Sequence, residues 1–156
     1  MEYTFFWSGP FSQWYKSEFT IDGKKFCTAE QYMMYSKAIH FGDEEIAQKV
    51  MATRDPKKQK ALGRQVKNFD ATEWNRVARL YVFDGNYAKF TQNEDLLKIL
   101  MATGDTVLVE ASPYDAIWGI GMSEEEARKT PADKWKGTNW LGLAITKVRE
   151  ELLRKV

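Results

Sequence analysis

The chain has 156 residues and a formal net charge of +1, from 23 Lys and Arg against 22 Asp and Glu; this length suits one domain, and this balance excludes a nucleic-acid coat protein or an acidic tail protein. A single cysteine, Cys27, excludes an intramolecular disulfide and a metal site built from cysteines, and we expect it to be buried in a strand. No segment approaches the roughly 18 uninterrupted apolar residues of a membrane span, and the first residues carry no basic leader, so we expect a soluble, cytoplasmic protein with no membrane partner.

The first elements predicted along the chain are a hairpin and a helix. Residues 18–26, EFTIDGKKF, alternate apolar and polar positions around Asp22-Gly23, a dipeptide typical of a two-residue hairpin turn. Thr28 and Gln31 form the pattern of a capping box, which predicts a helix that ends near residue 39.

The rest of the chain is predicted to be mainly helical. Capping residues and apolar residues at helical spacing predict helices over 43–51, 55–66, 72–90 and 93–101. A β-branched run predicts a strand over 106–110, and Ser123 opens a short helix that Pro131 stops. A last helix begins at about residue 139 and carries on one face Leu141, Ile145, Val148 and Leu152. We therefore expect an α+β fold, rich in helices with a small β-sheet, in which residues 1–156 form a single domain.

The segment TAEQYMMYSKA (28–38) places two ionisable groups in an apolar helix. Glu30 and Lys37 share a face with Met33 and Met34 and lie about 10 Å apart along the axis. Because apolar residues surround this helix, keeping both charges there indicates a use for them. The structural alternative is that Glu30 favours the helix dipole and that Lys37 extends to water.

A second candidate region is VLVEASPYDAIWGIG (107–121), in which a strand leads into a loop. The region carries Glu110, Asp115 and Trp118, while Gly119 and Gly121 permit close approach of the backbone to a ligand. An acid beside an indole suits a site that binds a flat ring and stabilises a positive charge. The alternative is that Asp115 caps a turn.

Two further features can be interpreted either as contacts for phosphate or as ordinary parts of the structure. Lys57, Lys60, Arg64 and Lys67 share one face of a predicted helix, which is either solvated or binds phosphate, with Arg64 the best candidate for a bidentate contact. The last helix, at Asn139, has an N-terminus that either accepts an anion on free N–H groups or carries a normal cap. The chain lacks GxGxxG and Walker motifs, and its single histidine argues against zinc, so we expect neither a metal nor a cofactor.

Five segments, taken together, resemble the NADAR family, also called YbiA-like. They run in the family order from about Phe5 to Leu153: FSQWYKSEFTIDGKKFCTAEQYMMYSKA, GRQVKNFD, EWNRVARLYVFDGNYAKF, VEASPYDAIWGIG and KGTNWLG. The resemblance implies a YbiA-like fold and an N-glycosidase that cuts the bond between a base-like amine and ribose C1′. It implies two kinds of substrate, ribosylamino-pyrimidine phosphates early in riboflavin synthesis and ADP-ribose attached to guanine, in DNA or in a smaller compound.

Residue patterns and the resemblance together define the candidate site. The catalytic candidates are Glu30, Lys37 and Asp115. The substrate-binding candidates are Ser12, Gln13, Arg64, Trp74, Glu110, Trp118, Gly119 and Asn139. Gln13 stands where many members of the family have Asn, which bears on the contact expected of that amide.

The chemistry of such a cleavage matches these residue types. Breaking a ribosyl C–N bond builds positive charge at C1′, which one carboxylate can stabilise while a second group assists the leaving amine or activates water. Glu30 and Asp115 can divide those tasks, Trp74 and Trp118 can stack on the base, and basic side chains can hold phosphate. A desolvated Lys37 can form a Schiff base with the opened sugar.

The preferred hypothesis is removal of ADP-ribose from guanine. The alternatives are an N-glycosidase of riboflavin-pathway intermediates and a module that binds ADP-ribose or NAD without turnover. Modified single-stranded DNA is a possible partner as the carrier of the base, and the resemblance makes an ADP-ribosyltransferase counterpart conceivable.

Overall fold

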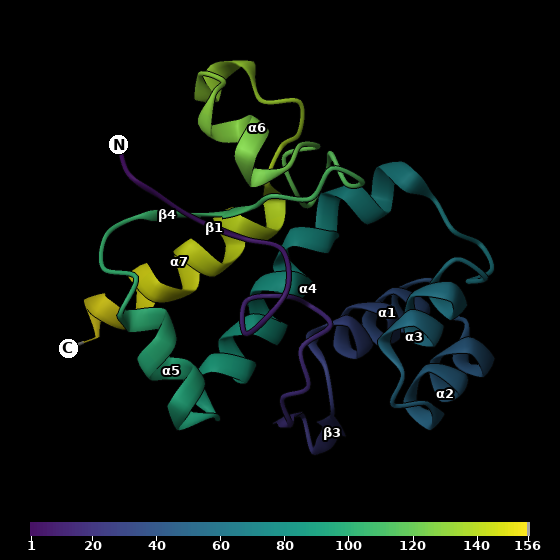
Figure 1. Cartoon of the computed structure of the whole chain (residues 1–156). Helices are drawn as coiled ribbons and strands as arrows, with labels where there is room; N and C mark the ends of the chain where they lie inside the picture. Colours follow the sequence, from purple (N-terminus) through teal and green to yellow (C-terminus); the bar gives the residue numbers. More distant parts are fainter. Residues whose placement is uncertain (156) are drawn as a thin grey trace. The chain divides into compact units, whose positions relative to one another are not determined.

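The structure is a computed structural model that describes residues 1–155. Its helices are α1 (Ala29–His40), α2 (Glu44–Ala52), α3 (Pro56–Gly63), α4 (Ala71–Thr91), α5 (Glu94–Met101), α6 (Glu124–Arg128) and α7 (Trp140–Arg154), with a 3-10 turn η1 (Ala132–Lys134). Its strands are β1 (Tyr3–Phe6), β2 (Phe19–Ile21), β3 (Lys24–Phe26) and β4 (Val107–Glu110). The predicted α+β class is confirmed, since helices predominate over two small sheets (Figure 1).

Contacts within the chain define two compact units. One comprises Gln13–Leu97, and the other comprises Met1–Ser12 with Lys98–Val156. The prediction that the whole chain forms a single domain stays a prediction. No helix within residues 1–155 is both long and apolar enough to cross a membrane.

The unit of residues 13–97 is built around α1, which packs against α2, α3 and α4 (Figure 1). The predicted hairpin is confirmed: β2 and β3 pair antiparallel, with Phe19 opposite Phe26. Asp22 and Gly23 have φ angles of 51° and 79°, which are the positive values that a tight two-residue turn requires. One core cluster consists of Phe19, Phe26, Tyr32 and Ala88.

The predicted start of α1 is also confirmed. The Thr28 hydroxyl accepts a hydrogen bond from the Gln31 backbone N–H at 3.0 Å, and the Gln31 side-chain oxygen accepts one from the Cys27 N–H at 2.8 Å. Cys27 is buried, as predicted, although it follows the last residue of β3 rather than lying within the strand. These bonds orient the first turn of α1, which carries Glu30.

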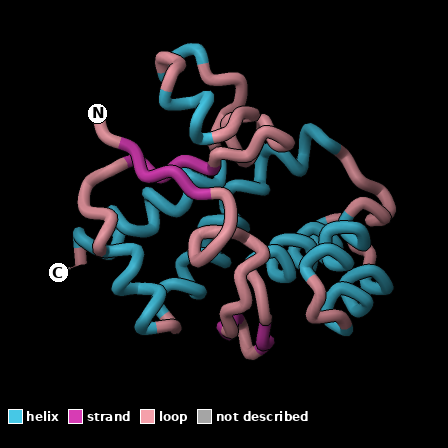
Figure 2. The backbone as a smooth tube through the Cα atoms, in the orientation of Figure 1, coloured by secondary structure: helices cyan, strands magenta, loops and turns pink. Residues whose placement is uncertain are grey.

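The other unit has a parallel pair of strands, β1 and β4 (Figure 2), with Phe6 opposite Glu110. Helix α7 packs on β4, and its predicted apolar face is confirmed by the burial of Leu141, Ile145 and Val148. A second core cluster consists of Val109, Ile120, Met122 and Ala127. The paired strands therefore support the loop that follows β4, which carries Asp115 and Trp118.

Strand β1 and the end of helix α3 differ from the sequence-based expectation. Strand β1 was not predicted, because its partner β4 lies about 100 residues further along the chain and its own four residues show no polar alternation. Helix α3 ends at Gly63 rather than near residue 66. A side chain at Gly63 would collide with the Met34 sulfur, so this glycine, a poor helix former, permits α3 to approach α1.

Candidate active site

Helix α1 carries the first pair of candidate catalytic groups. Glu30 lies in the first turn and is only 7% exposed, and its backbone N–H donates to the Gln13 carbonyl at 3.0 Å. Lys37 lies two turns later and is half-buried. Burial lowers the pKa of Lys37, the Glu30 charge opposes this shift, and the Arg64 charge adds to it. Glu30 and Arg64 therefore both lie within electrostatic reach of Lys37.

Two aromatic rings lie near the Lys37 ammonium group. Its Nζ lies 4.5 Å from the centre of the Phe69 ring and 6.0 Å from that of Trp74. Phe41 contacts both rings, with centroid distances of 5.5 Å to Phe69 and 6.4 Å to Trp74. The faces of these rings stabilise the charged amine, while the burial that they impose favours the neutral one. The sequence-based reasoning had identified Trp74 but had missed Phe41 and Phe69.

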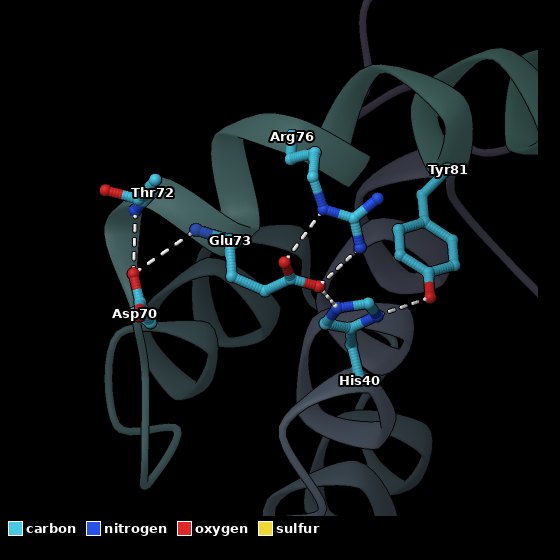
Figure 3. Close-up of polar contacts among 6 residues, drawn as sticks. All are labelled: His40, Asp70, Thr72, Glu73, Arg76 and Tyr81. Atoms are coloured by element: carbon cyan, nitrogen blue, oxygen red, sulfur yellow. Dashed lines mark hydrogen bonds and ion pairs between the residues drawn. The ribbon is translucent and has the colours of Figure 1, made fainter.

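A polar network joins the end of α1 to the first half of α4 (Figure 3). His40 Nε2 lies 2.6 Å from a Glu73 carboxylate oxygen, and His40 Nδ1 lies 2.9 Å from the Tyr81 hydroxyl. Arg76 donates two hydrogen bonds to Glu73, at 2.8 and 2.9 Å. The Tyr81 ring in turn stacks on Trp74, with centroids 5.9 Å apart and an interplanar angle of 21°. The sequence had not predicted this network.

The hydrogen bonds that Glu73 accepts, first from Arg76 and then from His40, lower the pKa of its carboxyl to about 2. At neutral pH Glu73 is thus ionised and can only accept. His40 Nε2 must therefore carry the hydrogen that it shares with Glu73. Within residues 1–155, no three or more His, Cys, Asp or Glu side chains are grouped so that they could hold a metal ion.

The amide of Gln13 is directed into the interior of its unit. Its Oε1 accepts a hydrogen bond from Asn86 at 2.8 Å, and its Nε2 lies 3.9 Å from the Met33 sulfur. Asn86, on α4, is fully buried and also donates to the Val82 carbonyl at 2.8 Å. Asn86 was missed because a lone amide in a long helix carries no sequence signal. These bonds hold Gln13 beside α1, and its predicted contact with substrate stays a prediction.

In the other unit, Asp115 adopts the turn-capping geometry that was the structural alternative for this residue. Its Oδ1 accepts hydrogen bonds from the backbone N–H groups of Ile117, at 2.9 Å, and Trp118, at 2.8 Å. Trp118 is partly buried, and its ring meets that of Trp140 edge to face, with centroids 5.6 Å apart. Asp115 thus orients the loop that presents Trp118.

The N-terminus of α7 is held by backbone hydrogen bonds to the loop that follows β4. The backbone N–H groups of residues 138–141 donate to the carbonyls of residues 116–119, at 2.9 to 3.0 Å, which favours the structural alternative for this helix end. The loop after β4 occupies these N–H groups, because Gly119 and the three residues before it fold back onto the start of the helix.

Asn139 holds β4 against the start of α7. Its Oδ1 accepts from the Glu110 N–H at 2.9 Å, and its Nδ2 donates to the Leu108 carbonyl at 3.0 Å. A Cβ on Gly119 would lie 3.2 Å from the Glu110 carboxylate and closer still to two carbonyls, so a larger residue there would disrupt the loop. Both residues therefore have a structural role, and their predicted contacts with substrate stay predictions.

The remaining candidates lie nearer the surface. Arg64 caps the C-terminus of α3 and is exposed, as are the other cations of the predicted stripe, Lys57, Lys60 and Lys67. Ser12 is partly buried, and its N–H donates to the Gly9 carbonyl at 2.9 Å. The structure thus groups Glu30, Lys37, Arg64 and Trp74 in one unit, and Glu110, Asp115, Trp118, Gly119 and Asn139 in the other.

Comparison with known proteins identifies similar chains. The model of the NADAR domain family matches residues 5–153. An N-glycosidase of Acanthamoeba polyphaga mimivirus is 45% identical over 146 residues, which cover 90% of this chain and 86% of the relative. The solved structure of Escherichia coli YbiA superposes with a TM-score of 0.81 at 27% identity, covering 99% of this chain and 86% of that one. A riboflavin biosynthesis protein of Vibrio vulnificus is 31% identical over 148 residues, 92% of this chain and 35% of the relative.

Proposed function

The chain belongs to the NADAR domain family, and we propose that it is an N-glycosidase that removes ADP-ribose from guanine, in DNA or in a nucleotide. The hydrolysis of an N-glycosyl bond is the reaction for which the viral and E. coli relatives are named. The observation that carries the proposal is the environment of Lys37. Burial lowers the pKa of its amine, which lies near the rings of Phe69 and Trp74 and interacts with the charge of Glu30.

In the proposed mechanism the C1′–N bond breaks and its electron pair leaves with the base, which takes up a proton. Glu30 stabilises the positive charge that develops at C1′. The neutral Lys37 amine then adds to C1′ and loses a proton, and the ring oxygen takes up a proton as the sugar opens to a Schiff base. Water hydrolyses the Schiff base, which restores the lysine and releases ADP-ribose.

The surroundings of Lys37 also supply groups for binding. Trp74, which is 7% exposed and stacks on Tyr81, is the ring proposed to meet the purine. Arg64, which is exposed and close enough to affect the pKa of Lys37, provides a guanidinium for the diphosphate. An aromatic ring for the base and a cation for phosphate, both near a reactive amine, match the parts of an ADP-ribosylated base. An enzyme that transfers ADP-ribose to guanine would have to supply this substrate.

For Asp115 we propose a role in orienting Trp118 and, as predicted from the sequence, in stabilising charge in the reaction. The two hydrogen bonds to its Oδ1 favour the first of these roles. Asp115→Asn keeps an oxygen that can accept both bonds. If the carboxylate charge matters to the chemistry, this variant lowers kcat while the protein stays folded; an unchanged kcat leaves orientation as its task.

A second candidate substrate is a ribosylamino-pyrimidine phosphate. It is favoured by the similarity to the Vibrio vulnificus riboflavin biosynthesis protein, of which this chain spans about a third. The same amine, carboxylate and stacking ring would serve it, because it too has a ribose C1′ bound to a base-like amine. A binding module without turnover is disfavoured, since a nearly buried carboxylate and a partly desolvated lysine are costly to keep without chemistry.

The deciding experiment supplies both substrates to the purified protein in parallel. Guanine-ADP-ribosylated single-stranded DNA and a ribosylamino-pyrimidine phosphate are incubated with wild type, Glu30→Gln and Lys37→Ala, and the products are followed by mass spectrometry. We expect wild type to restore guanine in the DNA and both variants to lose at least about 100-fold in kcat. Release of the pyrimidine alone would assign the second candidate, and turnover of neither would contradict the N-glycosidase proposal.

Glu44→Gln is a matched control for Glu30→Gln. Glu44 occupies the first turn of α2 as Glu30 occupies that of α1, but it is exposed. If Glu30 serves only the helix dipole, the two variants lose similar stability and neither loses kcat. Reduction with borohydride during turnover should attach the ribosyl group to wild type and not to Lys37→Ala; without such an adduct, the Schiff-base step is wrong.

A further inference from the structure

The polar network beside Trp74 is the part of this unit that the proposed chemistry leaves unused. Its hydrogen bonds run from Arg76 through Glu73 and His40 to the hydroxyl of Tyr81 (Figure 3). The ring of Tyr81 stacks on that of Trp74. Its first members are held in place by the start of α4, where Asp70 accepts hydrogen bonds from the N–H groups of Thr72 and Glu73 at 2.9 and 3.2 Å. The network therefore connects a rigid helix end to an aromatic ring.

Each hydrogen bond of the network has its donor on the side away from Glu73 and its acceptor on the side toward Glu73. Arg76 donates to the ionised carboxylate, and His40 donates through Nε2. In the neutral imidazole Nδ1 then accepts, so the Tyr81 hydroxyl must donate to it. The hydrogen bond between His40 and Tyr81 also forms when the imidazole carries both protons, because the Tyr81 oxygen can then accept from Nδ1. The hydroxyl of Tyr81 is therefore held at one point in either state.

The ring of Tyr81 passes this constraint to Trp74. The two residues are seven positions apart on α4, which places them on one face two turns apart, and their rings are nearly parallel. Trp74 meets Tyr81 as well as Phe41 and lies 6.0 Å from the Lys37 ammonium. A tilt of the Tyr81 ring would thus change how Trp74 lies beside the amine.

We propose that His40 is a positioning residue, which acts through the hydroxyl of Tyr81 to hold the Trp74 ring in the orientation that stacks on the substrate base. This inference rests on the proposed function. Neither His40 nor Tyr81 needs to touch the reacting atoms. Their contribution therefore appears in the binding of base-bearing substrate, while the rate of bond cleavage depends on Glu30 and Lys37.

The test measures kcat and KM for three variants of the network. His40→Ala should raise KM about fivefold, with kcat within a factor of two of wild type, because one hydrogen-bonded constraint is lost. Tyr81→Phe, which keeps the ring and loses the hydroxyl, should do the same. His40→Gln can donate to Glu73 and accept from Tyr81, so it should recover most of the lost affinity. A network that served only stability would lower the folded fraction and kcat and leave KM unchanged, which would overturn the proposal.

A double-mutant cycle tests whether His40 acts through Trp74. In a Trp74→Leu background, His40→Ala should cause no further rise in KM, because the ring that it positions is gone. Equal and additive effects in the two backgrounds would overturn the proposal. Lys49→Ala is the control, since it breaks an exposed ion pair with Glu45 in the same unit and should leave both constants unchanged.

A spectroscopic measurement separates this inference from the proposed function. The protein is labelled with 5-fluorotryptophan, and the Trp74 resonance is assigned by its absence in Trp74→Leu. His40→Ala and Tyr81→Phe should shift or broaden this ¹⁹F signal, and Lys49→Ala should not. If wild type turns over no ribosylated base but the signal responds, the proposed function fails and the positioning stands. If substrate is cleaved but neither the signal nor KM responds, the positioning fails alone.

Discussion

At the residue scale, the informative feature is the environment of one amine. Lys37 lies one turn before the end of α1, where burial lowers its pKa and Glu30 and Arg64 act on it with opposite signs. The sequence correctly indicated that the charges of this helix are not ordinary surface groups, because Glu30 is nearly buried and Lys37 is half-buried. It had no means of indicating Phe69, which comes from a loop 32 positions further along the chain.

The environment of Lys37 predicts the pH dependence of kcat. A Schiff base requires the neutral amine, so kcat should rise with pH through the lowered pKa of Lys37, below the range of an ordinary lysine. Arg64→Gln removes a charge that lowers this pKa, so the rise should move to higher pH. The pH profile of kcat measures both. If kcat rises over the same pH range in Arg64→Gln as in wild type, the rise does not report the neutral amine of Lys37.

At the element scale, the structure shows how loops are held to regular elements. Asn139, with a left-handed φ of 54°, ties the Glu110 N–H and the Leu108 carbonyl of β4 to the start of α7. The sequence placed a helix start at this residue correctly. It did not show that the Asn139 amide makes its hydrogen bonds with β4, because the strand and the helix meet only after folding.

Replacing this amide should destabilise the protein. Asn139→Ala leaves buried backbone groups of β4 without their partner and forces alanine into a left-handed conformation, which we expect to cost about 3 kcal/mol in total. Asn68, with a φ of 59°, is exposed and serves as the control, since Asn68→Ala should cost only about 1 kcal/mol of backbone strain. Urea unfolding measures the difference. Equal losses would mean that the Asn139 side-chain bonds contribute nothing.

At the scale of the whole molecule, one buried group connects stability to pH. Lys89, on α4, is fully buried, and burial lowers its pKa to about 7. In the unfolded chain this lysine has its ordinary pKa of 10.5. Between these values the unfolded state binds more protons than the folded state, so the free energy of unfolding rises with pH. Below about pH 7 both states are protonated and the destabilisation is complete.

Lys89→Met removes this dependence. From pH 7 to 9 the unfolding free energy of wild type should rise relative to that of the variant, with a slope that approaches about 1.4 kcal/mol per pH unit for one proton. Urea unfolding at several pH values measures the slope, and Lys49→Met, at an exposed site, should behave as wild type does. Parallel curves for wild type and Lys89→Met would show that Lys89 does not release its proton on folding.

The sequence by itself determined the elements whose signals are local. These are the hairpin at Asp22-Gly23, the capped start of α1, the apolar face of α7 and the predominance of helices, all of which depend on residues within one or two turns of each other. The tertiary structure alone decided the pairing of β1 with β4, the rings near Lys37 and the network from Arg76 to Trp74. It also decided that the loop carbonyls occupy the N-terminus of α7. Each of these features includes at least one contact between residues far apart in the chain, and its energy depends on distance and burial, which no local pattern contains.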